Sequence, residues 1–160
     1  MLNTRAMQHI YYSLIYSHLF YCHTVWGAAG KFKTNSLMTA QKRTIRTMSY
    51  LKKYDHTNES FKTLRLLKYK DINTYCCALY VYKSVNNHIS NDFFQFRVNE
   101  RYPLRNNNIL DTPYMRTTQS QTSIRYHGVK VWNDLPSFVK EKISVTSFKK
   151  ALKLSLLSQY

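Results

Sequence analysis

One long uncharged stretch limits what this chain can fold into. Residues 6–30 contain no Lys, Arg, Asp or Glu, and on a helical wheel their apolar side chains lie on every face. A helix that is apolar all round is either buried or spans a membrane. Polar side chains such as His18 and His23 favour the first, so we expect a buried core helix that Gly27 and Gly30 end. The alternative is a small basic helical membrane protein in which residues 6–30 span the ~30 Å of hydrocarbon.

Positive charge dominates the sequence as a whole. The 160 residues include 24 Lys and Arg but only 8 Asp and Glu, which gives a formal net charge of +16. Residues 1–54 hold eight of the basic side chains and no acidic one, and Asp55 is the first carboxylate. Such a charge density destabilises an isolated compact state by self-repulsion, which a polyanionic partner relieves. We therefore expect binding to the phosphate backbone of RNA and DNA, with an anionic membrane surface as the less favoured partner.

Apolar residues at helical spacing predict a mainly α fold. One helix is expected from Thr34 or Asn35 to Leu51, with Lys42, Arg43 and Arg46 opposite its apolar arc. Further helices are predicted over 58–67, from Asp71 to about Asn87, and over 145–158.

We divide the chain into a helical region over 1–87, an irregular basic connector over 88–127, and a turn with an amphipathic C-terminal helix over 128–160. The connector contains two prolines and loses clear periodicity, which favours irregular structure with a short hairpin. A weak alternation at Ser123–Tyr126 predicts an edge strand.

Basic side chains are the candidate functional residues. Arg and Lys neutralise phosphates, and neighbouring Tyr and Trp rings can stack on exposed bases. The candidate phosphate ligands are Lys42, Arg43, Arg46, Arg105, Arg116 and Arg125. A solvated outer helix face and a surface loop would account for the same residues. Trp132 fits a core anchor as well as a stacking side chain.

No catalytic, cofactor or metal site is predicted. Two-metal chemistry needs clustered carboxylates, and only Asp55 and Glu59 lie close together in the sequence. A structural zinc site needs four ligands, which His18, Cys22 and His23 do not complete. The odd number of cysteines, three, argues against a disulfide framework and for a reducing, intracellular compartment, either nucleus or cytoplasm.

Four stretches in order along the chain are similar to one known family. They are Tyr11–Gly27, Leu37–Met48 with Gln41-Lys42-Arg43-Thr44-Ile45-Arg46 at its centre, Phe61–Ile72, and Ser123–Pro136 with Trp132-Asn133-Asp134-Leu135-Pro136, continuing into Ser147-Phe148-Lys149-Lys150. In these residues the chain resembles the C-terminal region of reverse transcriptases from non-LTR retrotransposons (long interspersed elements) of jockey-like and related clades.

The resemblance implies a fragment without catalytic function of its own. It covers the thumb-like region and the tail, which in the family grip template RNA and the primer duplex. The fingers and the palm, with its catalytic aspartates, would precede Met1. One departure is Tyr102-Pro103-Leu104-Arg105, where the family often has a Tyr-Asn-Thr-Arg-like motif. A basic interaction module adopted by a host is a further alternative.

Overall fold

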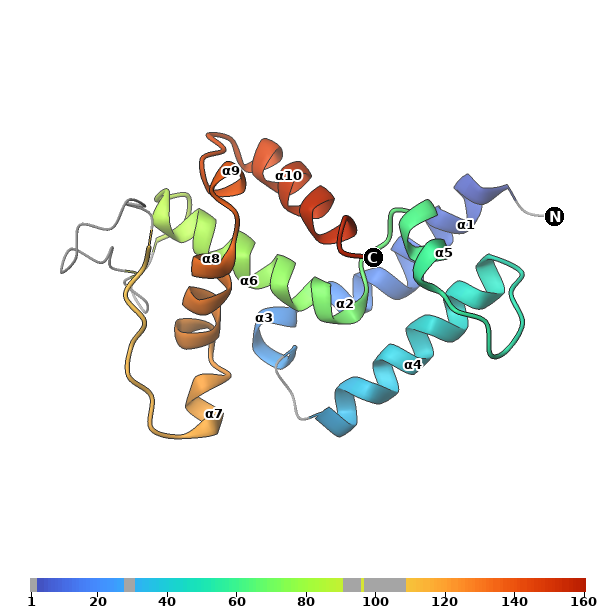
Figure 1. Ribbon diagram of the computed structural model, residues 1–160, viewed down its shortest axis with the longest axis horizontal. Helices are drawn as coiled ribbons and strands as arrows, with labels where there is room; N and C mark the ends of the chain where they lie inside the picture. Colours follow the sequence, from blue (N-terminus) through green and yellow to red (C-terminus); the bar gives the residue numbers. More distant parts are fainter. Residues whose placement is uncertain (1–2, 28–30, 91–95, 97–108) are drawn as a thin grey trace. The chain divides into compact units, whose positions relative to one another are not determined.

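Helices make up the regular structure of the part of the chain that the computed structural model describes, residues 3–27, 31–90, 96 and 109–160 (Figure 1). No strand occurs within those ranges, which confirms the mainly α fold class. The elements in order are α1 (Thr4–Ile10), the π-helix η1 (Tyr11–Tyr16), α2 (Ser17–Phe20), α3 (His23–Trp26), α4 (Lys31–Met48), α5 (Asn58–Thr63), α6 (Tyr69–Val85), α7 (Thr118–Gln121), the π-helix η2 (Ile124–Gly128), α8 (Val129–Asp134), α9 (Ser137–Lys140) and α10 (Val145–Leu157).

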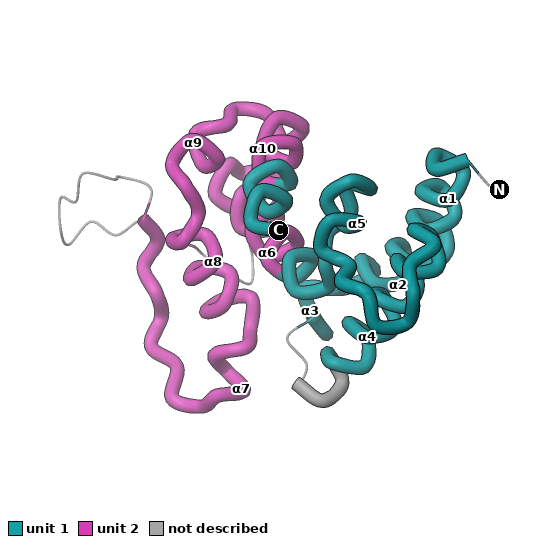
Figure 2. Tube along the Cα trace, turned by 45° about the vertical axis from the view of Figure 1, so that its right-hand side comes forward, with its two compact units in different colours: residues 1–73, 153–160 teal, residues 74–152 magenta. Residues whose placement is uncertain are grey.

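The chain forms two compact units, coloured separately in Figure 2. Unit 1 comprises residues 1–73 and 153–160, and unit 2 comprises residues 74–152. Their limits fall inside α6 and α10, so each unit contains part of both helices. The division at 87 and 127 inferred from sequence stays a prediction.

The N-terminal helical stretch ends earlier than predicted. It runs from Thr4 through η1 to Phe20, whereas the sequence indicated one helix that continued to the glycines. Cys22 adopts a left-handed conformation with φ of 49°, which breaks the helix before α3. The Trp26 indole N–H donates to the Tyr21 carbonyl oxygen over 2.5 Å and closes this break. Within the described ranges, no helix has both the length and the apolar character that crossing a membrane requires.

Gly27 accommodates a buried histidine. A Cβ atom at this position would collide with the imidazole of His23. Only 1% of His23 is exposed, and its ring lies edge-on to Trp26 and Tyr69, with centroid distances of 4.6 and 5.1 Å. The absence of a side chain at Gly27 therefore leaves room for the imidazole of His23 beside the end of α3.

The core of unit 1 is built from α4, α5 and the N-terminal stretch. Tyr11, Ile45, Phe61, Leu64 and Leu66 form one buried cluster. The helix α4 begins at Lys31, before the predicted Thr34 or Asn35, and ends at Met48. The helix α5 ends at Thr63 rather than residue 67, because Arg65 takes a left-handed φ of 51°.

A buried glutamine connects the elements of this core. The Gln41 side-chain amide donates to the Tyr11 hydroxyl over 2.8 Å and to the Leu67 carbonyl over 2.9 Å. Its Oε1 accepts from the Tyr69 N–H over 2.8 Å. Burial raises the pKa of Tyr11 to about 12, so its hydroxyl remains protonated. The α4 helix is thereby held against η1 and against the loop that leads into α6.

Aromatic rings form the core of unit 2. Phe148 stacks on Tyr82 with a centroid distance of 4.1 Å, and Trp132 lies 6.2 Å from Phe148. The Tyr82 hydroxyl donates to the Lys142 carbonyl over 2.6 Å. Because Trp132 is 3% exposed, it is a core anchor and not a base-stacking side chain.

The predicted edge strand at Ser123–Tyr126 is wrong. These residues begin the π-helix η2, and Gly128 at its end lies close to α6: an added Cβ would meet Val81 at 3.1 Å. The alternation that favoured a strand instead reflects partial burial along this helix. The hairpin was predicted within the connector over 88–127, of which residues 91–95 and 97–108 lie outside the described residues.

Removal of the Phe148 ring tests the unit 2 core. Phe148→Ala is expected to lower the free energy of unfolding by about 3–5 kcal/mol, because the contacts of the ring with Tyr82 and Trp132 are lost and a cavity remains. The control is Phe138→Ala, whose ring is 55% exposed and whose loss should change stability by no more than about 0.5 kcal/mol. Urea unfolding of both variants measures the difference, and equal losses would contradict the packing.

Candidate nucleic-acid interface

The helix α4 carries three of the six predicted phosphate ligands. Arg43 is exposed, whereas Lys42 and Arg46 are half-buried. Arg116 precedes α7 and Arg125 lies in η2, both exposed and both in unit 2. Arg105 lies outside the described residues. The structure therefore divides the predicted set between the two units.

Arg43 and Arg46 line an open groove on unit 1 of about 420 Å³. Its walls include the side chains Thr39, Arg43, Arg46, Thr47, Lys53 and Tyr54. Helical geometry explains the grouping, because positions 39, 43 and 46 recur on one side of α4 at about 100° per residue. Three cationic residues thus line one groove.

The loop after α4 completes the groove and is held in place by polar contacts. The Arg46 Nε donates to the Asp55 carbonyl over 3.0 Å, and the Asp55 carboxylate accepts from the Lys52 N–H over 2.8 Å. This geometry fixes the guanidinium of Arg46 beside the loop. Lys53, which follows Lys52 in this loop, is exposed.

Two exposed tyrosines accompany these cations. Tyr54 is 85% exposed and Tyr50 is 61% exposed. The Lys53 ammonium lies 5.5 Å from the centroid of the Tyr54 ring, within the range of a cation–π contact. Sequence reasoning did not single out Tyr54, although its position directly after Lys52-Lys53 was an available signal.

Lys42 belongs to a different pocket. Although adjacent to Arg43 in sequence, it points with Met38 and Gln41 toward the loop that leads into α6. Lys68 and Lys70 line the same pocket, and sequence reasoning had not singled them out. The basic arc of α4 therefore serves two separate surfaces.

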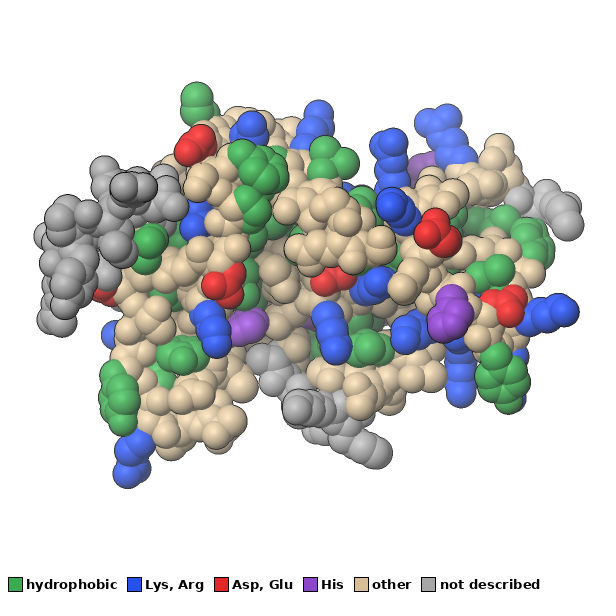
Figure 3. Space-filling view, viewed as in Figure 1, with side chains coloured by type: hydrophobic (Ala, Val, Ile, Leu, Met, Phe, Trp, Pro, Cys, Tyr) green, Lys and Arg blue, Asp and Glu red, His purple; other side chains and the backbone are tan. Residues whose placement is uncertain are grey.

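Basic side chains are more frequent than acidic ones on the face drawn in Figure 3. Figure 3 shows blue Lys and Arg side chains spread over the drawn face, with few red carboxylates among them. This distribution agrees with the net charge of +16.

The groups considered for metal binding or nucleophilic chemistry lie elsewhere. Within the described ranges, no three His, Cys, Asp or Glu side chains come together to hold a metal ion. The His23 Nδ1–H donates to the Leu19 carbonyl over 2.6 Å in the core. Cys76 and Cys77 are buried, and burial raises the pKa of each thiol to about 12. At neutral pH both remain protonated and poorly nucleophilic.

Comparison with known proteins found no relative. No family model matches the sequence, and neither a curated protein nor a solved structure shows significant similarity to it.

The buried imidazole of His23 makes stability depend on pH. Burial lowers its pKa below the ordinary value of 6.5, the hydrogen bond to Leu19 opposing this in part. A depressed folded-state pKa gives stability that is complete above pH 6.5 and is lost as the pH falls through the folded pKa. The unfolding free energy of the native protein is therefore expected to decline relative to that of His23→Phe between pH 7 and 5.

Chemical denaturation across this pH range measures the difference between the two proteins. His127 in unit 2 also has a lowered pKa, through burial and Lys130, but it is present in both proteins and cancels in the difference. Parallel pH profiles would show that His23 is not the group responsible.

Proposed function

We propose that the protein binds RNA and DNA through their phosphate backbone and that the groove beside α4 is a principal contact. The observation that carries this proposal is the convergence of three cations and an exposed tyrosine in one groove of unit 1. Cationic side chains neutralise phosphates without reading sequence. Binding is accordingly expected to be strong, salt-dependent and weakly selective.

The groove chemistry suits a single strand better than a rigid duplex. Arg43, Arg46 and Lys53 would lie along the backbone. The hydroxyls of Thr39 and Thr47 donate to the Asn35 and Arg43 carbonyls of α4, so the cations alone supply the phosphate contacts. The ring of Tyr54 offers an exposed face on which a base can stack. Because Arg46 is held by the Asp55 carbonyl, one cation of the groove is already oriented before the ligand arrives.

We further propose that this nucleic-acid binding belongs to a non-catalytic segment of a larger enzyme. The four stretches that resemble non-LTR retrotransposon reverse transcriptases support a role as the post-palm, thumb-like segment of such an enzyme. The groove residues Arg43 and Arg46 lie within the second of these stretches. In that setting the segment would grip template and primer while chemistry took place in the fingers and palm.

The salt dependence of binding tests the groove. Each lost phosphate contact lowers the slope of log K against log salt by about 0.7 for single strands and about 0.9 for duplexes. Arg43→Gln/Lys53→Gln is therefore expected to lower the slope by about 1.4–1.8. Both side chains are exposed, so the substitution leaves the core intact. Fluorescence anisotropy between 50 and 300 mM salt provides the measurement.

A charge-matched control separates local contacts from net charge. Lys149→Gln/Lys150→Gln removes two exposed cations from α10 in unit 2 and should change the slope much less. Equal effects of the two double variants would refute the groove as a specific contact.

Loss of the Tyr54 ring tests base stacking. Stacking on an aromatic side chain contributes about 1–3 kcal/mol per base, so Tyr54→Ala is expected to weaken single-stranded RNA binding by about fivefold or more. Duplex binding should change little because its bases are already stacked. Tyr114→Ala, which removes a ring that is 90% exposed in unit 2, is the control. A Tyr54 variant that binds single strands like the native protein would remove stacking from the proposal.

A further inference from the structure

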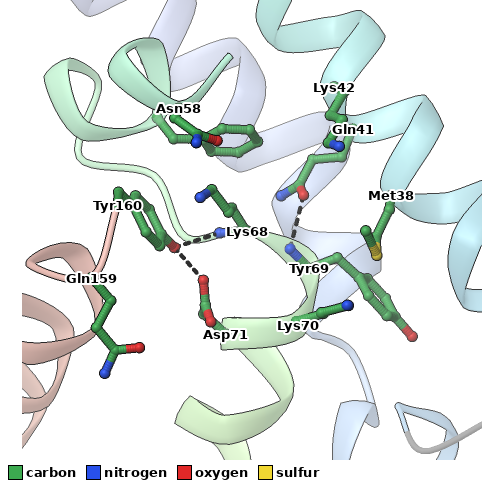
Figure 4. Close-up of a pocket in the computed structure, with 11 residues that line it drawn as sticks. Met38, Gln41, Lys42, Asn58, Lys68, Tyr69, Lys70, Asp71, Gln159 and Tyr160 are labelled. Carbon is green, nitrogen blue, oxygen red and sulfur yellow. Dashed lines mark hydrogen bonds between the residues drawn. The ribbon is translucent and has the colours of Figure 1, made fainter. Parts of the chain in front are cut away.

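A second basic site lies in unit 1, on the side of α4 that carries Lys42. It is a pocket of about 280 Å³ (Figure 4), just below the range of ~300–1,000 Å³ that ligand sites occupy. Lys42, Lys68 and Lys70 line it together with the amides of Asn58 and Gln159. The small volume suits a compact polar group rather than an extended chain.

One of the three lysines is positioned before any ligand arrives. The Lys68 ammonium lies 3.9 Å from the centroid of the Tyr160 ring, a close cation–π contact. The Tyr160 hydroxyl accepts from the Lys68 N–H over 2.8 Å and donates to the Asp71 carboxylate over 2.6 Å. Both ends of Lys68, its backbone and its ammonium, are therefore held by the same tyrosine.

The carboxylate in the pocket is part of this support. Asp71 is half-buried and is held by the Tyr160 hydroxyl, as the dashed lines in Figure 4 show. With one carboxylate and three ammonium groups, the lining is net positive even when Asp71 is ionised. The amides of Asn58 and Gln159 add neutral hydrogen-bond donors to the same lining.

We propose that this pocket binds a phosphomonoester group. Ammonium groups bind phosphate as point charges, and charge-assisted hydrogen bonds to phosphate oxygens are stronger than neutral ones. A terminal phosphate carries more charge than a backbone diester, and a group of that size fits a cavity of this volume. The phosphate can belong to the 5′ end of a nucleic acid or to a free nucleotide. The first source rests on the function proposed above.

The experiment compares ligands that differ in one phosphate. The affinity of the native protein is measured for three ligands. They are a 5′-phosphorylated RNA oligonucleotide, the same oligonucleotide with a 5′-hydroxyl, and adenosine 5′-monophosphate. We expect the phosphorylated end to bind about tenfold more tightly than the hydroxyl end, as one added charge-assisted contact would give. Adenosine 5′-monophosphate should bind in competition with the phosphorylated end.

Substitutions then locate the site. Lys42→Gln/Lys70→Gln should abolish the preference for the phosphorylated end, and Lys42→Arg should retain it because the charge is kept. Arg43→Gln/Lys53→Gln, which alters the groove alone, should keep the end preference while lowering the salt slope. The melting temperature of each variant establishes that it is folded. If the double variant is not, the single substitution Lys70→Gln at an exposed position provides the test, and it should weaken the preference.

The outcomes distinguish this proposal from the one before it. In one outcome the protein binds adenosine monophosphate in a way that Lys42→Gln/Lys70→Gln abolishes, yet shows no preference between the oligonucleotide ends. That result supports the pocket as a site for the phosphate of a free nucleotide. Equal binding of both ends together with no binding of the monophosphate overturns the pocket but leaves the groove standing. An unchanged salt slope in the groove variant overturns the groove but leaves the end preference as a separate result.

Discussion

The Gln41 side chain is the interaction on which the organisation of unit 1 depends. A single amide bonds to three partners: Tyr11 in η1, Leu67 in the loop after α5, and Tyr69 at the start of α6. Since a buried polar group without partners costs about 1–3 kcal/mol, these elements can pack only in the register that completes all three bonds. The orientation of α4 about its own axis follows from this constraint.

That orientation decides what the neighbouring cations do. Lys42 and Arg43 are consecutive residues of α4, so their side chains lie about 100° apart around the helix axis. With Gln41 directed inward, Lys42 lies over the loop that leads into α6 and Arg43 faces the loop that follows α4. Adjacent basic residues therefore reach two separate sites, the pocket that contains Asp71 and the groove that contains Tyr54.

The parts of the fold with regular apolar spacing could be predicted from sequence. Phe61 on α5 and Phe148 and Leu152 on α10 are buried as their spacing indicates. Leu67 is also buried, although it lies in the loop after α5 rather than in the predicted helix. The helix α6 ends beside Asn87, where the paired asparagines had predicted its end. Burial of one helical face leaves a direct trace in the sequence, because every third or fourth residue must be apolar.

Helix ends set by tertiary contacts left no such trace. Gly and Asn are the residues that signal a left-handed turn, yet Cys22, Tyr50 and Arg65 adopt this conformation here. The two π-helices also escaped prediction, since one extra residue in a turn hardly changes the apolar pattern. For the site, α4 itself was predictable. Its division into two surfaces was not predictable, because that division depends on the loop over residues 52–55 and on residues 68–71 at the start of α6.

The position of residues 153–160 in unit 1 has a consequence for the order of folding. Tyr160 bonds to Lys68, 92 positions earlier, and its ring lies edge-on to Phe61. A chain emerging from the ribosome must therefore expose all of residues 74–152 before unit 1 receives its last segment. Domains commonly fold during synthesis from the N-terminus onward, and contacts distant in sequence slow folding. Unit 1 begins first but is completed last, so its basic pocket acquires the tyrosine that orders Lys68 only after unit 2 has been synthesised.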